Sequence, residues 1–240
     1  SCAAFDVNQG CTGYIYGVWL AANLIAAGSL KRVLLLVGDT ISQYVSPKDR
    51  SVFSLFGDAG SATLLEYDAE APKLYCSLGT DGSGHSHLIV PSGGARTIKS
   101  DDVLTDSVRG GEHLSMNGAE IFAFSLREVP KMLQEILSQA CWDLDHVDHW
   151  VLHQANRFML QHLGRLLHIP PNKMPLVIEE YGNTTSASIP LTINHALRES
   201  LTTEHKKIIL SGFGVGLSWG SIALETESLI LPTVIEVENL

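Results

Sequence analysis

The feature that most constrains this chain is a cysteine held between two glycines, immediately before a long helical pattern. Cys11 lies between Gly10 and Gly13, a spacing that suits a tight strand-to-helix turn from which the side chain of a strained residue projects. At a helix N-terminus, the helix dipole and unpaired N–H groups favour a thiolate and can hold an oxyanion. The pattern predicts a nucleophilic cysteine. The plainer alternative is a small buried residue in a close-packed turn.

The order of hydrophobic patterns predicts an alternating α/β chain. Apolar residues recur at helical spacing over residues 12–27 and 117–140, with Gly28 after the first helix and Pro130 expected to bend the second. Short continuous apolar runs predict strands over residues 33–38, 62–67, 149–152 and 207–210. The first of these runs has the composition of a parallel strand that is covered on both faces. Between residues 79 and 109 the chain is rich in Gly, Ser, Asp and His, which predicts a long loop.

A second candidate for chemistry follows the strand expected over residues 149–152. His153 comes directly after this strand and before the next helical pattern. Ligands of open α/β sheets bind beyond the carboxyl ends of the strands, so a histidine in this position is well placed for chemistry. The alternative is that His153 merely caps the helix. The other nine histidines lack the spacing of metal ligands.

The same order of elements occurs twice in the chain. The turn with Cys11 is followed by a helix, the basic pair Lys31-Arg32 and a strand, and a turn with Asn183 is followed by a helix, the pair Lys206-Lys207 and a strand. Two pseudo-repeated halves are therefore expected, although α/β proteins repeat such units in any case. If the halves pack about a twofold axis, Cys11 and Asn183 lie in equivalent turns that approach one another.

Together, Cys11, His153 and Asn183 suit acyl transfer between thioesters. A thiolate can accept an acyl group, while a histidine N–H and an asparagine amide can donate hydrogen bonds to a thioester carbonyl that becomes an enolate. The backbone N–H groups of Cys11 and Val215 can form a second oxyanion hole, because glycine on each side of Val215 lets the backbone approach a substrate closely.

Composition excludes several other classes of function. A net charge of -10 with scattered Lys and Arg argues against a nucleic-acid-binding surface. No apolar run reaches the length that crosses a bilayer, and no signal peptide is visible, so we expect no membrane association. The four cysteines form no metal-binding pair and no disulfide framework, which favours a reducing cytoplasm.

Five motifs in this chain resemble those of β-ketoacyl-acyl carrier protein (ACP) synthase III, a condensing enzyme. The resemblance covers nearly the whole chain, and the five motifs are specific together because they occur in the order of the family. They are Asn8-Gln9-Gly10-Cys11-Thr12-Gly13-Tyr14, Phe56-Gly57-Asp58-Ala59-Gly60, His153-Gln154-Ala155-Asn156, Tyr181-Gly182-Asn183-Thr184-Thr185-Ser186-Ala187-Ser188 and Gly212-Phe213-Gly214-Val215-Gly216-Leu217-Ser218-Trp219-Gly220.

The resemblance implies a fold and a reaction. The fold is α/β, a thiolase-like αβαβα arrangement of layers with two pseudo-repeated halves. In the reaction, Cys11 is acylated by an acyl-CoA, and His153 and Asn183 assist decarboxylation of malonyl-ACP. The resulting carbanion attacks the acyl-Cys11 thioester and gives a β-ketoacyl-ACP, the first condensation of fatty acid synthesis. No cofactor is needed beyond the CoA and ACP thioesters, and the resemblance also implies a cytoplasmic homodimer.

The resemblance further implies where substrates bind. Arg50 matches an arginine that contacts the CoA nucleotide, Asn156 matches a residue of the pantetheine tunnel, and Phe213 belongs to the final glycine-rich motif and is expected to contact substrate. Arg157 is the candidate for docking the carrier protein, because Phe158 stands where the family often has a basic residue. Val215 stands where the family commonly has glycine, a change that keeps the backbone amide but alters the pocket.

The family has a long segment before the nucleophile, and this chain begins close to it, so we expect the first half to be incomplete and this chain alone to be a doubtful enzyme. The expected domains are residues 1–68, the remainder of the N-terminal half with the nucleophile; residues 69–116, a loop-rich connection that shapes the substrate pocket; and residues 117–240, the C-terminal half.

Residues at a few positions distinguish this chain from related classes of enzyme. A thiolase is expected to carry a second cysteine in the last glycine loop, the elongating synthases I and II carry histidine where this chain has Asn183, and plant-type polyketide synthases usually read GFGPG where this chain has Gly212-Phe213-Gly214-Val215-Gly216. Two alternatives stay open: a secondary-metabolite or polysaccharide-linked relative of synthase III, and a non-catalytic subunit of a thiolase-fold heterodimer.

Overall fold

The computed structural model describes residues 2–93 and 111–237, so most of the loop expected over residues 79–109 lies outside the described residues. The strands are β1 (Arg32–Asp39), β2 (Ala59–Glu66), β3 (Tyr75–Thr80), β4 (Leu88–Ile89), β5 (Ser115–Met116), β6 (His149–Leu152), β7 (Lys206–Gly214) and β8 (Ser218–Thr226). The α-helices are α1 (Gly13–Ala26), α2 (Gly118–Ala140), α3 (Arg157–Leu166), α4 (Ile178–Tyr181), α5 (Ser188–Ala196) and α6 (Arg198–Thr203). Short 3-10 helices include η1 (Gly10–Thr12), η2 (Ile41–Tyr44), η3 (Gly82–His87), η5 (Leu144–His146), η6 (Pro171–Lys173) and η7 (Thr185–Ala187).

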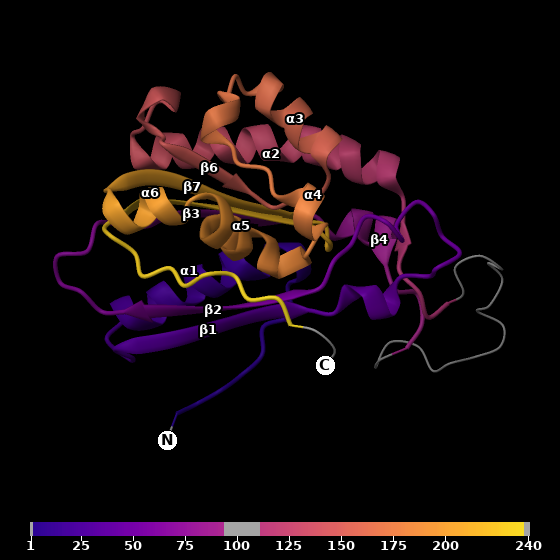
Figure 1. Cartoon of the computed structure of the whole chain (residues 1–240), viewed down its shortest axis with the longest axis horizontal. Coiled ribbons are helices and arrows are strands. Elements are labelled where there is room, and N and C mark those ends of the chain that lie inside the picture. The colour runs from indigo at the N-terminus through magenta and orange to yellow at the C-terminus, as the bar shows by residue number, and fades with distance from the viewer. Residues whose placement is uncertain (1, 94–110, 238–240) are drawn as a thin grey trace.

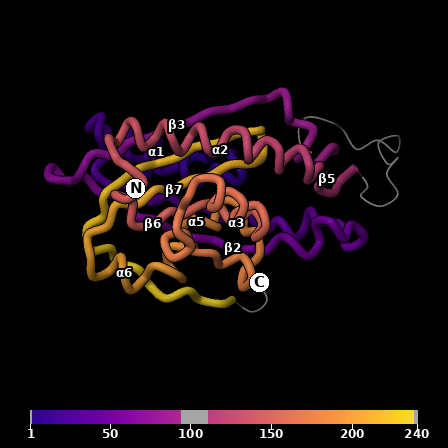
Figure 2. Tube along the Cα trace, turned by 90° about the horizontal axis from the view of Figure 1, so that it is seen from above, coloured from indigo at the N-terminus to yellow at the C-terminus, as the bar shows by residue number. Residues whose placement is uncertain are grey.

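The elements stack in layers (Figure 1). One layer is a four-stranded sheet in the order β3-β8-β7-β6, in which only the pair β6 and β7 is parallel. Helices α2 and α3 lie on one side of this sheet, and α1 and α5 lie on the other side, where they also contact the β1–β2 pair. The view from above places α2 along β3 and α5 toward β6 (Figure 2). The expected layered α/β architecture is therefore present, with α, β, α and β layers in the described residues.

The two halves repeat one order of elements. The turn η1 leads into α1 and then into the antiparallel pair β1–β2, and the turn η7 leads into α5, α6 and then the antiparallel pair β7–β8. Both pairs bring glycines opposite each other, Gly38 to Gly60 and Gly212 to Gly220. The repeat that the sequence suggested is thus visible in the topology.

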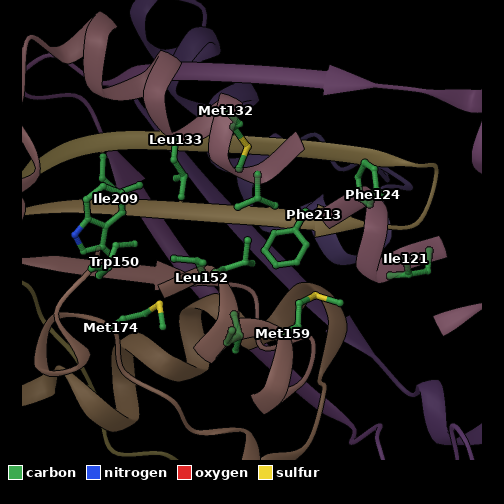
Figure 3. Close-up of a cluster of buried hydrophobic side chains, with 14 of the residues drawn as sticks. Ile121, Phe124, Met132, Leu133, Trp150, Leu152, Met159, Met174, Ile209 and Phe213 are labelled. Atoms are coloured by element: carbon green, nitrogen blue, oxygen red, sulfur yellow. The ribbon is translucent and has the colours of Figure 1, made fainter. Parts of the chain in front are cut away.

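The largest core lies between α2 and the four-stranded sheet. Side chains of α2 face side chains of β6 and β7 across this layer (Figure 3), among them Ile121, Phe124, Met132, Leu133, Trp150, Leu152, Ile209 and Phe213. The helical spacing of apolar residues over 117–140 therefore marks the buried face of α2, and the helix continues through Pro130. A second core surrounds α1 and α5 between the sheets.

One expectation about the strands was wrong, and one edge strand was missed. The run at residues 33–38 was expected to be parallel and covered on both faces, but β1 pairs antiparallel with β2. Its outer side chains Leu34 and Leu36 are 59% and 68% exposed, because no described element packs on that face. In addition, β3 was not anticipated; this strand falls in the expected connecting region of residues 69–116 but pairs with β8 at the edge of the four-stranded sheet.

The helix ends follow local chemistry. Gly28, at φ +74°, takes the left-handed conformation after the end of α1. The side chain of Asn156 caps α3 by accepting a hydrogen bond from the N–H of Met159 at 2.8 Å. The alternative role considered for His153, helix capping, is therefore filled by Asn156. None of the helices that the structure describes is both long and apolar enough to cross a membrane.

Gly57 provides a test of how tightly the halves meet. A Cβ atom at this position would lie 2.0 Å from the carbonyl oxygen of Tyr181, which is backbone and cannot swing away. We expect Gly57→Ala to lower the free energy of unfolding by about 3 kcal/mol, as overpacking at a rigid contact does. Urea denaturation measures this change. The matched control is Gly82→Ala, where a Cβ meets nothing within 4 Å; equal stability of the two variants would contradict the predicted contact.

Candidate active site

The turn that carries Cys11 is fastened to the β7–β8 loop. Cys11 lies in η1, directly before α1, and is 6% exposed. The next residue, Thr12, is fully buried; its hydroxyl bonds to the carbonyl of Gln9 at 3.1 Å and to the hydroxyl of Ser218 at 2.9 Å. Ser218 donates in turn to the carbonyl of Val215 at 2.7 Å. The nucleophile turn and the final glycine loop are thus connected by a chain of hydrogen bonds.

Glycine is required where this loop passes over the thiol. A Cβ at Gly214 would lie 2.9 Å from both Cβ and Sγ of Cys11, and a Cβ at Gly212 would lie 3.0 Å from the carbonyl oxygen of Cys11. Val215 itself is accommodated because Gly10 lacks a side chain: a Cβ at Gly10 would lie 2.3 Å from Cγ1 of Val215. The extra bulk of Val215 is therefore taken up on the Gly10 side of the turn.

Burial controls the charge state of Cys11. Desolvation, the largest effect, and the nearby Asp39 carboxylate raise the pKa of the thiol, which in this site is about 11 instead of 9.0. Hydrogen bonds from the backbone N–H groups of Val215 and Cys11 act in the opposite direction and lower this pKa. The sequence-based expectation of a favoured thiolate is therefore wrong for the resting site, because loss of solvent outweighs the N–H donors. Both N–H groups therefore lie within hydrogen-bond reach of the sulfur.

His153 is held at the end of β6. Its backbone N–H donates to the carbonyl of Ser211 on β7 at 2.7 Å, and its ring Nδ1 lies 2.7 Å from the hydroxyl of Ser188. Phe213 packs edge-on against the ring with centroids 5.7 Å apart. Burial lowers the pKa of His153 from 6.5 to about 4, against a smaller raising effect of a hydrogen bond to the backbone of Thr185. The ring is therefore neutral at physiological pH and can act as a hydrogen-bond donor.

Asn183 is positioned by the Phe56-Gly57 motif. The backbone of Asn183 donates to the carbonyl of Leu55 at 2.8 Å and accepts from the N–H of Gly57 at 3.1 Å. Its side-chain Oδ1 accepts from the N–H of Thr185 at 3.0 Å, and Nδ2 donates to the carbonyl of Ala155 at 3.3 Å. Since an amide nitrogen carries two hydrogens, one remains for a ligand.

The structure brings the three predicted residues into one region. The Cys11 turn η1 contacts η7 and the end of β7. Asn183 precedes η7 and bonds to Ala155, two residues beyond His153, while His153 bonds to Ser188, the residue that follows η7. Residues from both halves therefore lie around the turn that carries Cys11.

The predicted substrate-binding residues occupy different surroundings. Arg50 is exposed beside the buried Asp49. Phe213 is buried against His153, and Asn156, partly buried, commits its side-chain oxygen to the α3 cap. Arg157 is exposed and forms an ion pair with Glu179. The charge of Arg157 is thus already compensated on the surface.

Several residues at this site were missed by sequence reasoning. Ser188 and Thr185 lie inside a quoted motif, but nothing in their spacing assigned them to His153 or Asn183. Asp39 lies at the end of β1, and its carboxylate accepts hydrogen bonds from Thr185 and Ser186 across the two halves. Positions 39 and 185 are far apart in the chain, so no local sequence pattern could have predicted this contact. Within residues 2–93 and 111–237, no histidine, cysteine and carboxylate side chains cluster as a metal site would require.

Comparison with known proteins gives one consistent family. Residues 5–82 match the model of 3-Oxoacyl-[acyl-carrier-protein (ACP)] synthase III, and residues 137–226 match the C-terminal domain of the same synthase. The chain is 36% identical over 226 residues to "Beta-ketoacyl-[acyl-carrier-protein] synthase III" of Porphyra umbilicalis, covering 94% of this chain and 69% of that protein. It is 35% identical to the protein of the same name from Symbiobacterium thermophilum, covering 92% of this chain and 67% of that one.

Solved structures agree with these matches. A 3-oxoacyl-(acyl-carrier protein) synthase from Burkholderia xenovorans superposes with a TM-score of 0.92 at 45% identity, over 98% of this chain and 68% of that chain. The synthase III of Pseudomonas aeruginosa superposes with a TM-score of 0.81 at 32% identity, over 95% and 68% of the two chains. The expected thiolase-like layered fold is therefore confirmed.

The raised pKa of Cys11 predicts a steep pH dependence of its reactivity. Below about pH 11 the thiol form predominates, so the thiolate fraction, and with it the rate of alkylation by iodoacetamide, should rise about tenfold per pH unit between pH 7 and 10. Mass spectrometry of the Cys11 peptide measures this rate, and Cys11→Ser supplies the background from the other three cysteines. A plateau near neutral pH would show that the thiolate already exists in the resting enzyme.

Proposed function

Because this chain belongs to the β-ketoacyl-ACP synthase III family, we propose that Cys11, His153 and Asn183 carry the two half-reactions of this condensing enzyme. The family reaction transfers an acyl group from acyl-CoA and condenses it with malonyl-ACP in fatty acid biosynthesis. It needs no cofactor beyond the two thioester substrates. One observation supports this assignment of residues. The turns η1 and η7, one from each half, contact each other, and η1 carries the buried thiol that accepts a hydrogen bond from the N–H of Val215.

In the first half-reaction, Cys11 Sγ attacks the carbonyl carbon of the acyl-CoA thioester. The carbon–sulfur bond to CoA breaks, and CoA leaves as the free thiol with the proton that Cys11 loses. The N–H groups of Cys11 and Val215 stabilise the oxyanion of the tetrahedral intermediate, a role supported by their hydrogen bonds to the sulfur. A thiol that is neutral at rest fits this reaction, because its proton leaves only as acyl transfer proceeds.

In the second half-reaction, malonyl-ACP loses carbon dioxide and becomes an enolate. His153 and Asn183 donate hydrogen bonds to its thioester oxygen, and the enolate carbon attacks the acyl-Cys11 carbonyl. The bond to Sγ then breaks, and the Cys11 thiolate takes up a proton. For Nε2 of His153 to donate, Nδ1 must accept, so this role requires the single hydrogen of the Ser188 hydroxyl to go to Nδ1 rather than to the Thr185 carbonyl 2.9 Å away. The neutral ring of His153 supports this role, because donation requires no change of charge.

Substrate contacts form a second part of the proposal. The exposed position of Arg50 supports a contact with the charged CoA nucleotide. Asn156 keeps its side-chain nitrogen for pantetheine after its oxygen caps α3, and Phe213 forms the apolar wall beside His153. Arg157 docks the carrier protein once it is released from Glu179.

Assembly and location complete the proposal. We infer a homodimer, because β1 and β2 form a sheet of only two strands among the described residues and expose Leu34, Leu36 and Leu64. We place the enzyme in the cytoplasm, since all four cysteines are free thiols. The functional units are the halves of residues 1–68 and 117–240, joined by residues 69–116.

The two half-reactions predict different effects of single substitutions in the full-length enzyme. Cys11→Ala should abolish acylation by acyl-CoA, because no other side chain is assigned to hold the acyl group. His153→Ala and Asn183→Ala should still become acylated, yet release carbon dioxide from malonyl-ACP about 100- to 1000-fold more slowly, since each loses one preorganised donor. Intact mass and carbon dioxide release measure the two steps.

The variants serve as controls for one another. Cys11→Ala should retain slow decarboxylation of malonyl-ACP, because His153 and Asn183 are intact. An Asn183→Ala enzyme that lost acylation while it kept decarboxylation would place Asn183 beside the thiol reaction and overturn its assigned role.

The assembly proposal predicts a dimer in solution. Burying the exposed leucines of the β1–β2 sheet, on the order of 25 cal/mol per Å² of apolar surface, favours association. We expect sedimentation of the full-length enzyme at micromolar concentration to give the mass of two chains. A monomer under these conditions would contradict the proposal, and Leu36→Ala, which keeps the backbone and removes exposed apolar surface, tests whether this face takes part.

A further inference from the structure

Asp39 makes an unusual set of contacts for a residue that the reaction does not use. Its Oδ2 accepts hydrogen bonds from the hydroxyl of Thr185, from the N–H of Ser186 at 3.2 Å and from the hydroxyl of Ser186 at 2.5 Å. Asp39 ends β1 in the first half, whereas both donor residues belong to η7 in the second half. One carboxylate oxygen therefore holds a turn that lies 146 residues further along the chain.

Thr185 connects this carboxylate to both assisting residues. Its N–H donates to Oδ1 of Asn183 at 3.0 Å, and the hydroxyl of Ser188 lies between the Thr185 carbonyl, at 2.9 Å, and Nδ1 of His153, at 2.7 Å, with one hydrogen to donate to either of them. Thr185 therefore lies between Asp39 on one side and the two proposed donors on the other.

The backbone of Thr185 needs such support. It has φ +48°, in the left-handed region that β-branched residues rarely adopt. Strained backbone of this kind persists only where the surroundings over-determine it. A carboxylate is a strong acceptor, and charge-assisted hydrogen bonds are shorter and stronger than neutral ones. The contacts of Asp39 are therefore suited to hold Thr185 in place.

We propose that Asp39 is a positioning residue for decarboxylation, which orients Asn183 and His153 through Thr185. This inference rests on the proposed roles of Asn183 and His153 and extends them to the first half of the molecule. Asp39 would support the second half-reaction, because its hydrogen bonds go to η7 and none goes to Cys11. Its negative charge disfavours the Cys11 thiolate, since it raises the pKa of Cys11.

Two substitutions separate the charge of Asp39 from its acceptor oxygen. Asp39→Ala removes both, and we expect the kcat for decarboxylation of malonyl-ACP to fall about 100-fold with KM unchanged, as a misplaced catalytic group does. Asp39→Asn keeps one acceptor oxygen, so its kcat should be only about tenfold below that of the wild type. In both variants, alkylation of Cys11 by iodoacetamide should be at least as fast as in the wild type, because a repulsive charge is gone.

Asp58 is the matched control. Its carboxylate also accepts from the N–H and the hydroxyl of one serine, Ser42, but this serine belongs to η2 and not to η7. Asp58→Ala should leave both decarboxylation and alkylation unchanged.

Ser186→Ala removes a single donor to Asp39 and gives an independent variant if Asp39→Ala does not fold. We expect this substitution to slow decarboxylation about tenfold. In the Asp39→Asn background it should cause no further decrease in rate, because both substitutions weaken the same contact.

Failure of the inference about Asp39 can be distinguished from failure of the proposed function. A wild-type enzyme that neither becomes acylated nor decarboxylates malonyl-ACP refutes the assigned reaction. A wild-type enzyme that does both, together with Asp39→Ala and Ser186→Ala variants of normal decarboxylation rate, refutes the role of Asp39. A parallel loss of Cys11 alkylation and decarboxylation in folded Asp39 variants also refutes it, because that pattern indicates general disruption of the site.

Discussion

The site depends on the close approach of the loop between β7 and β8 to the cysteine turn. The N–H of Val215 reaches the sulfur of Cys11 because Gly214 has no Cβ, which would otherwise lie 2.9 Å from that sulfur. The hydrogen bond between Thr12 and Ser218 keeps the two segments together. Geometry of this kind lets backbone amides stabilise an oxyanion without reorganisation during the reaction. The glycines therefore serve the chemistry as well as the packing.

Burial sets the charge states in which the residues work. It raises the pKa of Cys11 to about 11 and lowers that of His153 to about 4, so both side chains are uncharged at neutral pH. The site therefore holds preorganised donors and a neutral thiol, and negative charge develops only as a substrate reacts. In a site with little water, a hydrogen bond to such a developing charge is worth more than it is at the surface.

The two halves of the molecule contribute different parts of this arrangement. The first half supplies the thiol and Asp39, and the second half supplies His153, Asn183 and the Val215 loop. Backbone contacts also cross between the halves, since Phe56 and Asn183 form a parallel bridge and the N–H of Gly57 donates to Asn183. Contacts between the halves therefore also position a residue of the site, and substitutions there can affect both stability and rate.

The amino-acid sequence alone was enough to predict the α/β class, the positions of α1, α2, β6 and β7 and the repeat of two halves, and it suggested Cys11, His153 and Asn183 as the reactive residues. It could do so because hydrophobic period and glycine turns are local, and because the motifs that resemble the family stand in its order. The antiparallel pairing of β1, the edge strand β3 and the state of the Cys11 thiol needed the tertiary structure, since each depends on what packs against it. The contacts of Asp39, Thr185 and Ser188 were decided only there, because hydrogen bonds between residues far apart in the chain leave no periodic trace in the sequence.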